Sequence, residues 1–196
     1  MTKSQKRQIQ VFQKLILDKN QSINLISRKS PQKQVELLLG QGLLTAGFLA
    51  PVLNSSQEDI LDIGSGNGFP GILFALLFPK RKFYLCERIR KKAELLKSLK
   101  HGLALDQVEI LCQPAEELQR SFDLALSQAS LPLEKMIKLL QKILSPKGKA
   151  FLWHSGKGSR QRASFPFMKI EVFKSYKING SAKALLKVQK KASLLF

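Results

Sequence analysis

Residues 60–71 join a short apolar run to a turn dense in glycine and then to a proline, an order that few folds accommodate. The run Ile60–Ile63 has the composition of a buried strand. Glycine lets the backbone after that strand adopt positive φ and approach a ligand closely. A helix that begins near Pro70 would direct its unpaired N–H groups to the same place. The segment therefore predicts a strand, a ligand-binding turn and a helix, the geometry of a nucleotide-type cofactor site.

The spacing of the glycines fits two kinds of cofactor site. Gly66, Gly68 and Gly71 match the GxGxxG pattern of dinucleotide sites, whereas Gly64, Gly66 and Gly68 match the GxGxG of S-adenosylmethionine sites. Asp62 favours the second, because a carboxylate at the end of the strand suits the cationic amino group of S-adenosylmethionine and would repel a pyrophosphate. We therefore favour S-adenosylmethionine over a nicotinamide cofactor.

The rest of the chain alternates strand-like and helical segments, which is typical of an α/β fold. We expect strands at 60–63, 82–87, 108–112, 122–127, 149–153, 170–176 and 184–190. We expect helices at 6–20, 32–53, 72–78, 89–103 and 133–144. Asn179 and Gly180 suit a hairpin turn between the last two strands. The domain prediction is a helical extension over 1–56, followed by a Rossmann-like cofactor domain over 57–196.

A second carboxylate, Glu87, ends the next predicted strand roughly twenty residues after the glycines, where it can accept both hydroxyls of a ribose. Dehydrogenases and methyltransferases share that feature. The pair Ala115–Glu116 after the third strand and a closing antiparallel strand favour a methyltransferase. Cys86 and Cys112 lie in apolar runs without metal-ligand spacing, so we expect two free, buried thiols and no metal site.

The segment 35–53 is apolar enough to raise the question of a membrane span. It falls slightly short of the usual length and contains Gln41, Pro51 and three glycines, which favours a buried helix. The N-terminus does not resemble a signal peptide. We therefore expect a cytoplasmic protein without membrane attachment.

The 196-residue chain has a formal net charge of +19, and its lysines and arginines are spread over its whole length. Such a charge predicts a polyanionic partner, and nucleic acid is favoured over an acidic membrane or a role in solubility alone. The basic helix over 88–100 and the C-terminal Lys183, Lys187, Lys190 and Lys191 are expected to contact phosphates.

The segment 62–71 resembles the first motif of the rRNA small subunit methyltransferase G family. Its ending Phe69–Pro70–Gly71 is the specific part, because most Rossmann-like methyltransferases lack a proline there. Lys91–Lys92 and Ala115–Glu116 fit the family as well. The resemblance implies a class I S-adenosylmethionine-dependent methyltransferase, with a seven-stranded, mostly parallel sheet and a helical N-terminal extension. It also implies methylation of guanine N7 in small-subunit (16S) ribosomal RNA, either naked or in the assembled subunit, by a monomeric enzyme.

The motifs and the resemblance together give the expected site. The expected cofactor-binding residues are Asp62, Gly64, Ser65, Gly66, Gly68, Phe69, Glu87, Arg88, Ala115, Glu116 and Gln128. The expected substrate-binding residues are Ser127, His154, Lys157, Lys91 and Lys92. No catalytic residue is assigned, because guanine N7 carries a lone pair and no proton and needs no general base. For Trp153, packing in the core is favoured over stacking on a flipped guanine.

Several positions depart from the pattern of the family. Gln128 and Pro114 stand where the family has arginines, and His154 stands where it has a lysine. An amide or a proline cannot replace a guanidinium fork. Two alternatives therefore stay open: a non-catalytic RNA-binding relative that keeps the cofactor fold, and a small-molecule methyltransferase, for which the charge of +19 gives no reason.

Overall fold

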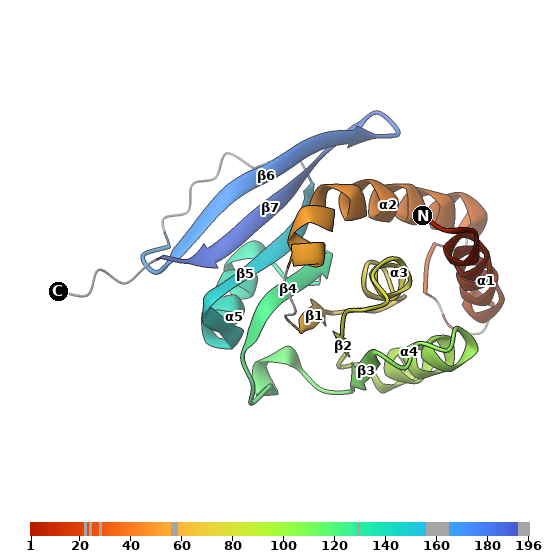
Figure 1. Cartoon of the computed structure of the whole chain (residues 1–196), viewed down its shortest axis with the longest axis horizontal. Coiled ribbons are helices and arrows are strands. Elements are labelled where there is room, and N and C mark those ends of the chain that lie inside the picture. Colours follow the sequence, from red (N-terminus) through yellow and green to blue (C-terminus); the bar gives the residue numbers. More distant parts are fainter. Residues whose placement is uncertain are drawn as a thin grey trace.

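A seven-stranded sheet crosses the middle of the molecule, with helices on both faces (Figure 1). The computed structural model describes residues 1–21, 23, 25–27, 29–55, 59–128, 130–155 and 165–191. Its strands are β1 (Ile60–Ile63), β2 (Phe83–Cys86), β3 (Val108–Leu111), β4 (Phe122–Gln128), β5 (Leu144–Ser155), β6 (Met168–Ile178) and β7 (Ser181–Lys190). Its helices are α1 (Lys3–Asn20), α2 (Pro31–Ser55), α3 (Gly71–Leu77), α4 (Arg90–Gly102) and α5 (Leu133–Ile143), with a short 3-10 helix at Ala115–Glu117.

The strands lie in the order β3-β2-β1-β4-β5-β7-β6. The first five pair in parallel, and β7 is antiparallel to both β5 and β6. The prediction of a seven-stranded, mostly parallel sheet is therefore confirmed. Because parallel strands place their carboxyl ends at one edge, the segments that follow β1, β2 and β4 meet there.

Two apolar cores lie on the two faces of the sheet. One contains side chains of α1, α2, α3 and α4, and the other contains side chains of α5. Phe12 of α1 and Leu49 of α2 pack in the first core together with Phe74 of α3. The helical extension thus shares its core with the sheet; the domain boundary at residue 56 stays a prediction.

Helix α2 is, in the part of the chain that the structure describes, the one helix long and apolar enough to cross a membrane. Of its most apolar window, 44% is buried inside the protein. Leu39, Leu49 and Leu53 are among the residues buried in the core. These contacts support the prediction of a buried helix in a globular protein.

The C-terminal hairpin is longer than predicted, but its turn lies where the sequence placed it. Asn179 has φ of 46° and Gly180 has φ of 74°, so both central residues are in the left-handed region that a two-residue hairpin turn requires. The structure adds residues 168–169 and 177–178 to β6 and residues 181–183 to β7. The added Lys169 and Lys177 are tolerated because they are exposed on β6, an edge strand.

One thiol does not lie where the sequence predicted it. Cys86 is buried, and its thiol donates to the carbonyl oxygen of Gln113 at 3.2 Å. Burial raises the pKa of Cys86 to about 12. Cys112, however, is exposed, and the prediction of a buried thiol is wrong. It follows β3, the other edge strand, so nothing flanks it on the outer side of the sheet.

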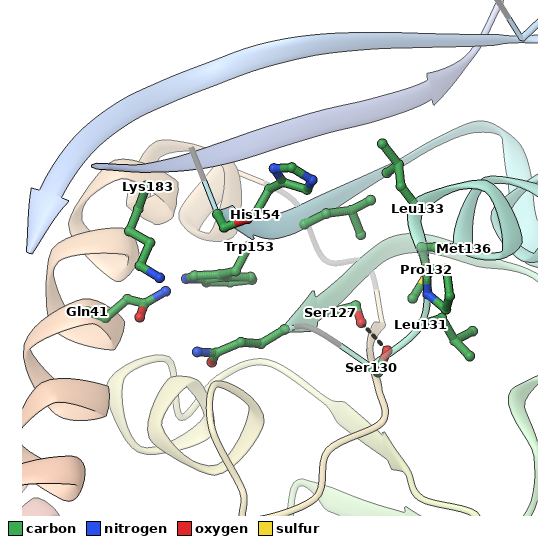
Figure 2. Close-up of a pocket in the computed structure, with 13 residues that line it drawn as sticks. Gln41, Ser127, Ser130, Leu131, Pro132, Leu133, Met136, Trp153, His154 and Lys183 are labelled. Carbon is green, nitrogen blue, oxygen red and sulfur yellow. Dashed lines mark hydrogen bonds between the residues drawn. The ribbon is translucent and has the colours of Figure 1, made fainter. Parts of the chain in front are cut away.

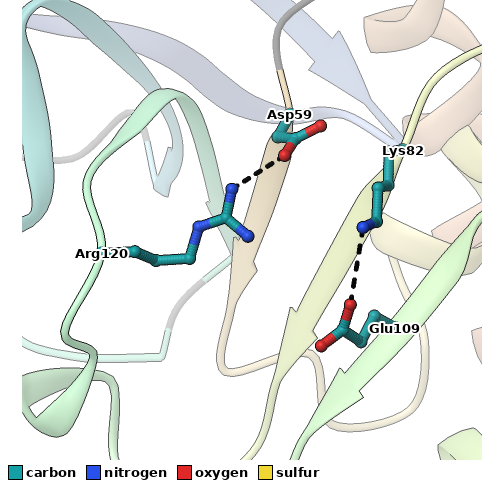
Figure 3. A network of polar contacts seen from close by, with 4 residues as sticks. All are labelled: Asp59, Lys82, Glu109 and Arg120. Carbon is teal, nitrogen blue, oxygen red and sulfur yellow. Dashed lines mark hydrogen bonds and ion pairs between the residues drawn. The ribbon is translucent and has the colours of Figure 1, made fainter.

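Two ion pairs lie toward the amino ends of the parallel strands (Figure 3). Arg120 Nη2 lies 2.8 Å from Asp59 Oδ2, and its guanidinium carbon lies 4.3 Å from the centroid of the Tyr84 ring. Lys82 pairs with Glu109 at 3.7 Å. This cluster lies at the edge of the sheet opposite the glycine turn.

Replacing Arg120 with alanine is expected to lower the free energy of unfolding by about 1 kcal/mol, since it removes a half-exposed ion pair and a cation–π contact. Urea denaturation measures that change. Lys97→Ala, which breaks the exposed pair with Glu94, is the matched control, with an expected loss of about 0.3 kcal/mol. Equal losses in the two variants would show that the aromatic contact of Arg120 adds nothing.

Candidate functional site

The glycine turn lies at the carboxyl end of β1, and its backbone decides between the two glycine patterns. Gly64, Gly66 and Gly68 have φ of 71°, 47° and 91°. Gly71, the first residue of α3, does not have a positive φ. Glycine is required there because a Cβ would lie 2.5 Å from Asp62 Oδ2. The three left-handed positions are those of the GxGxG spacing, which supports an S-adenosylmethionine site.

Asp62 lies beneath this turn, with only 1% of its surface exposed. Its Oδ2 accepts a hydrogen bond from Gly71 N at 3.2 Å, while its Oδ1 is buried and has no partner among the described residues. Burial raises the pKa of Asp62 to about 7, and the hydrogen bond from Gly71 N only partly opposes that effect. The negative charge of ionised Asp62 is therefore poorly stabilised by the protein itself. A cation bound nearby would stabilise it.

Glu87 follows β2 and is 5% exposed. Its Oε2 accepts from Gly66 N at 3.0 Å, and its Oε1 accepts from Ile89 N at 2.8 Å. These bonds fix the carboxylate beside the glycine turn. Each of its oxygens keeps a lone pair for a ligand, so Glu87 can still accept two hydroxyl groups of a ribose.

A cavity of about 550 Å³ opens between these elements. All of the expected cofactor residues except Asp62 and Gly68 line it: Gly64, Ser65, Gly66, Phe69, Glu87, Arg88, Ala115, Glu116 and Gln128. Asp62 and Gly68 stand behind its wall. The structure thus brings the separate motifs of the sequence into one cavity, which we call the cofactor cavity.

Sequence reasoning missed some residues of this cavity. Leu25 and Leu38 come from the helical extension. The pair Asn24–Leu25 resembles a motif of the family, but neither leucine was predicted to belong to the site. Gln113 follows β3 and Ser130 follows β4, so their places at the carboxyl ends of strands could have indicated them. Asn67 lies inside the glycine run, where its Oδ1 accepts from Phe69 N at 3.1 Å.

A second cavity, of about 530 Å³, lies beside the first at the ends of β4 and β5 (Figure 2). Ser127 and His154, both expected to bind substrate, line it. Helix α2 contributes Gln41 and strand β7 contributes Lys183. We call it the second cavity.

The other expected substrate residues lie elsewhere. Lys92 lines the cofactor cavity, and Lys91 lines neither cavity. Lys157 is outside the residues that the structure describes. Trp153, for which core packing was favoured, is 6% exposed and packs on Phe74, but it also lines the second cavity.

The two cavities meet. Gln128, Ser130 and Leu131 line both of them. Ser127 Oγ lies 3.0 Å from the carbonyl oxygen of Ile63 and 2.6 Å from Ser130 Oγ, which holds the end of β4 against the end of β1. Ligands bound in the two cavities would therefore lie next to each other.

The polar groups of the second cavity are suited to binding more than to acid–base chemistry. No carboxylate lines it among the described residues. His154 Nδ1 is buried without a partner there, so it can bond a ligand. Over the described ranges, no group of three or more His, Cys, Asp or Glu side chains is placed to hold a metal ion.

The model of the rRNA small subunit methyltransferase G family matches residues 5–192. The chain belongs to that family. Two proteins named Ribosomal RNA small subunit methyltransferase G, from two strains of Bacteroides fragilis, are 34% identical over 148 residues. The alignment covers 75% of this chain and 70% or 64% of theirs. A third, from Brachyspira hyodysenteriae, is 30% identical over 76% of this chain and 71% of its own. The chain thus spans about two thirds of the length of these curated relatives.

Solved structures agree with this family in fold. MtNAS, solved in complex with MTA and tNA, has a TM-score of 0.64 at 17% identity, over 95% of this chain and 74% of its own. A mutant of MtNAS was solved in complex with S-adenosylmethionine. Precorrin-6y C5,15-methyltransferase from Geobacter metallireducens has a TM-score of 0.54 at 16% identity, over 86% and 92%. This chain has a class I methyltransferase fold, and its cofactor, as a member of this methyltransferase family, is S-adenosylmethionine.

Proposed function

We propose that the protein methylates N7 of a guanine in small-subunit (16S) ribosomal RNA. The junction of the two cavities at Gln128, Ser130 and Leu131 supports this proposal, because ligands bound in the two cavities would lie next to each other at the carboxyl edge of the sheet. S-adenosylmethionine would supply the methyl group from the cofactor cavity. The guanine would enter the second cavity.

The residues of the cofactor cavity fit the chemical parts of S-adenosylmethionine. The backbone at Gly64 and Gly66 leaves room for close approach, and Glu87 offers its carboxylate to the ribose hydroxyls. Ala115 and Glu116 would flank the adenine. Asp62, with its unpartnered Oδ1, places negative charge behind the turn, on the side where a cationic amino group would be stabilised.

Methyl transfer to guanine N7 requires that the two ligands are aligned, and it requires no proton transfer. Guanine N7 has a free lone pair, so it can attack a methyl group that lies in line at near-attack distance. We therefore assign no general base to the second cavity. We propose that Gln128, at the junction, helps to hold the two ligands in line.

A large RNA also needs contacts outside the cavities. Arg88 and Lys92 line the cofactor cavity. We propose that these two, the neighbouring basic side chains of α4 and the basic side chains of β7 other than Lys183 bind phosphates of the ribosomal RNA. We also propose that the enzyme acts as a monomer in the cytoplasm, without membrane attachment.

Affinity for ribosomal RNA is expected to fall by at least about tenfold between about 50 and about 200 mM salt. Binding of lysine and arginine to phosphates releases counterions from the RNA, and added salt opposes that release. Filter binding at a series of salt concentrations measures the slope. Replacing Arg88 and Lys92 with alanine should flatten it, whereas Lys135→Ala on α5 should leave it unchanged. Affinity that barely responds to salt would contradict phosphate binding by this surface.

The activity itself is tested with labelled S-adenosylmethionine and under-methylated small ribosomal subunits, followed by nuclease digestion and mass spectrometry. We expect label in N7-methylguanosine, its loss in Glu87→Ala, and its retention in Asp59→Ala, which changes a carboxylate at the opposite edge of the sheet. Salt-dependent binding of RNA without label would instead support a non-catalytic, RNA-binding member of the family.

A further inference from the structure

We propose that Lys183 positions the target guanine and selects it over adenine, by donating a hydrogen bond from its ammonium group to O6 of the base. This inference rests on the proposed function, since it concerns the base that enters the second cavity. The sequence predicted only a phosphate contact for Lys183; the structure brings it into the cavity.

Three elements fix the place of Lys183. It lies on β7, opposite Ser155 of β5 and Tyr176 of β6. Gln41 of α2 is 8% exposed and donates from Nε2 to the hydroxyl oxygen of Tyr176 at 3.1 Å, which holds α2 against the hairpin. Figure 2 shows Lys183 and Gln41 beside the indole of Trp153. The ammonium group is therefore held at the wall of the second cavity.

The charge of Lys183 is not neutralised within the described part of the chain. It is the one lysine or arginine that lines the second cavity there, and no carboxylate lines the cavity with it. Its neighbour on the same strand, Lys187, pairs with Glu171 at 3.2 Å. Lys183 has no such ion pair among the described residues, so its three donors are available to a ligand.

An ammonium group at this wall distinguishes the two purines. Guanine carries a carbonyl oxygen at position 6, which accepts a hydrogen bond from an ammonium group. Adenine carries an amino group at that position, and an ammonium group cannot accept a hydrogen bond from the amino group. A hydrogen bond to O6 leaves the lone pair of the adjacent N7 free. With O6 held against Lys183, the base edge that bears N7 can face the junction at Gln128 and Ser130.

Trp153 makes this base contact measurable without turnover. It is the only tryptophan of the chain, and it lines the second cavity beside Lys183. Its fluorescence therefore reports directly on a base that enters. Guanosine, inosine and adenosine are the probes, titrated in the presence of S-adenosylhomocysteine; inosine keeps O6 but lacks the 2-amino group.

In the wild-type protein, guanosine and inosine should bind about tenfold more tightly than adenosine, the gain typical of one base-edge contact to a cation. Lys183→Met should abolish this preference, and Lys183→Arg, which keeps a donor, should retain it. Lys177→Met is the matched control: it removes the same charge from the exposed surface of the same hairpin, and the preference should persist.

A preference that survives Lys183→Met in a protein with an unchanged melting temperature would overturn the proposal, and so would wild-type protein that binds the three nucleosides equally. The methyl-transfer assay separates this outcome from failure of the proposed function. If subunits are methylated, Lys183→Met should lower kcat about tenfold. If subunits are not methylated but the nucleoside preference depends on Lys183, the base contact stands and the proposed reaction fails.

Discussion

Cofactor-free protein is expected to lose about 1.4 kcal/mol of stability between about pH 6 and about pH 8, and Asp62→Asn is expected to remove that loss. Burial raises the pKa of Asp62 from its usual 3.8 to about 7. The folded protein thus holds a proton that the unfolded chain has already released. This proton contributes its full share to the free energy of unfolding below the pKa that Asp62 has in the unfolded chain. That contribution is lost as pH rises through about 7, the pKa of Asp62 in the folded protein.

Cofactor binding should have the opposite pH dependence. A cationic amino group near the turn favours ionised Asp62, so affinity for S-adenosylmethionine should rise about tenfold over the same interval. The Asp62→Asn variant should bind weakly at every pH, yet unfold at higher temperature than the wild type above about pH 7. It gains stability because it no longer buries a carboxylate whose Oδ1 has no partner.

Thermal unfolding and calorimetric titration of both proteins across this interval provide the measurement. The variant serves as the control, because titration of the cofactor itself is common to both proteins. A pH profile that is the same in wild type and variant would show that Asp62 does not titrate there and that its charge does not reach the cofactor.

Replacing Gly64 with alanine is expected to cost about 2 kcal/mol of stability and to abolish measurable cofactor binding. Gly64 has φ of 71°, a conformation that a residue with a Cβ adopts only under strain. An added Cβ would also lie 2.3 Å from the Cβ of Ser130, so one of the two segments must move. Because Ser130 lines both cavities, that movement would distort their junction.

Gly47→Ala is the matched control for this substitution. Gly47 lies in α2, and no atom lies within 4 Å of the Cβ that the substitution adds. Alanine is the better helix former, so the control should gain up to about 1 kcal/mol and keep its affinity for the cofactor. Unfolding in urea and calorimetric titration compare the two variants. Normal cofactor binding by Gly64→Ala would show that this turn does not shape the cofactor cavity.

Local pattern was enough to predict most of the fold. The alternation of apolar strands with amphipathic helices predicted an α/β fold, and Asn179–Gly180 predicted the hairpin turn. The seven-stranded, mostly parallel sheet was implied by the resemblance to the family. The start of β5 was missed because residues 145–148 have the composition of a turn. In the structure, β5 already pairs there with Phe122 of β4, and the register shifts before Leu124. That pairing depends on the neighbouring strand, which local composition does not reveal.

The residues of the candidate site, like the strands, could be predicted only in part from the sequence. Glu87 and the glycines could be found because the carboxyl end of a parallel strand is a known place for a ligand. Lys183 could not be assigned to a cavity, because it reaches there only through the antiparallel pairing of β7 with β5. Asp62 was expected on the cavity wall, but it stands one layer behind it, where its Oδ2 accepts from Gly71 N.

A crystal structure of the protein soaked with S-adenosylhomocysteine would show directly whether the two cavities divide the reaction between cofactor and target. We expect the ribose hydroxyls at Glu87, the adenine beside Ala115, and the sulfur at the junction near Gln128, with the second cavity left open for the base. Binding of S-adenosylhomocysteine in the second cavity, or with its sulfur turned away from Gln128, would contradict the proposed transfer.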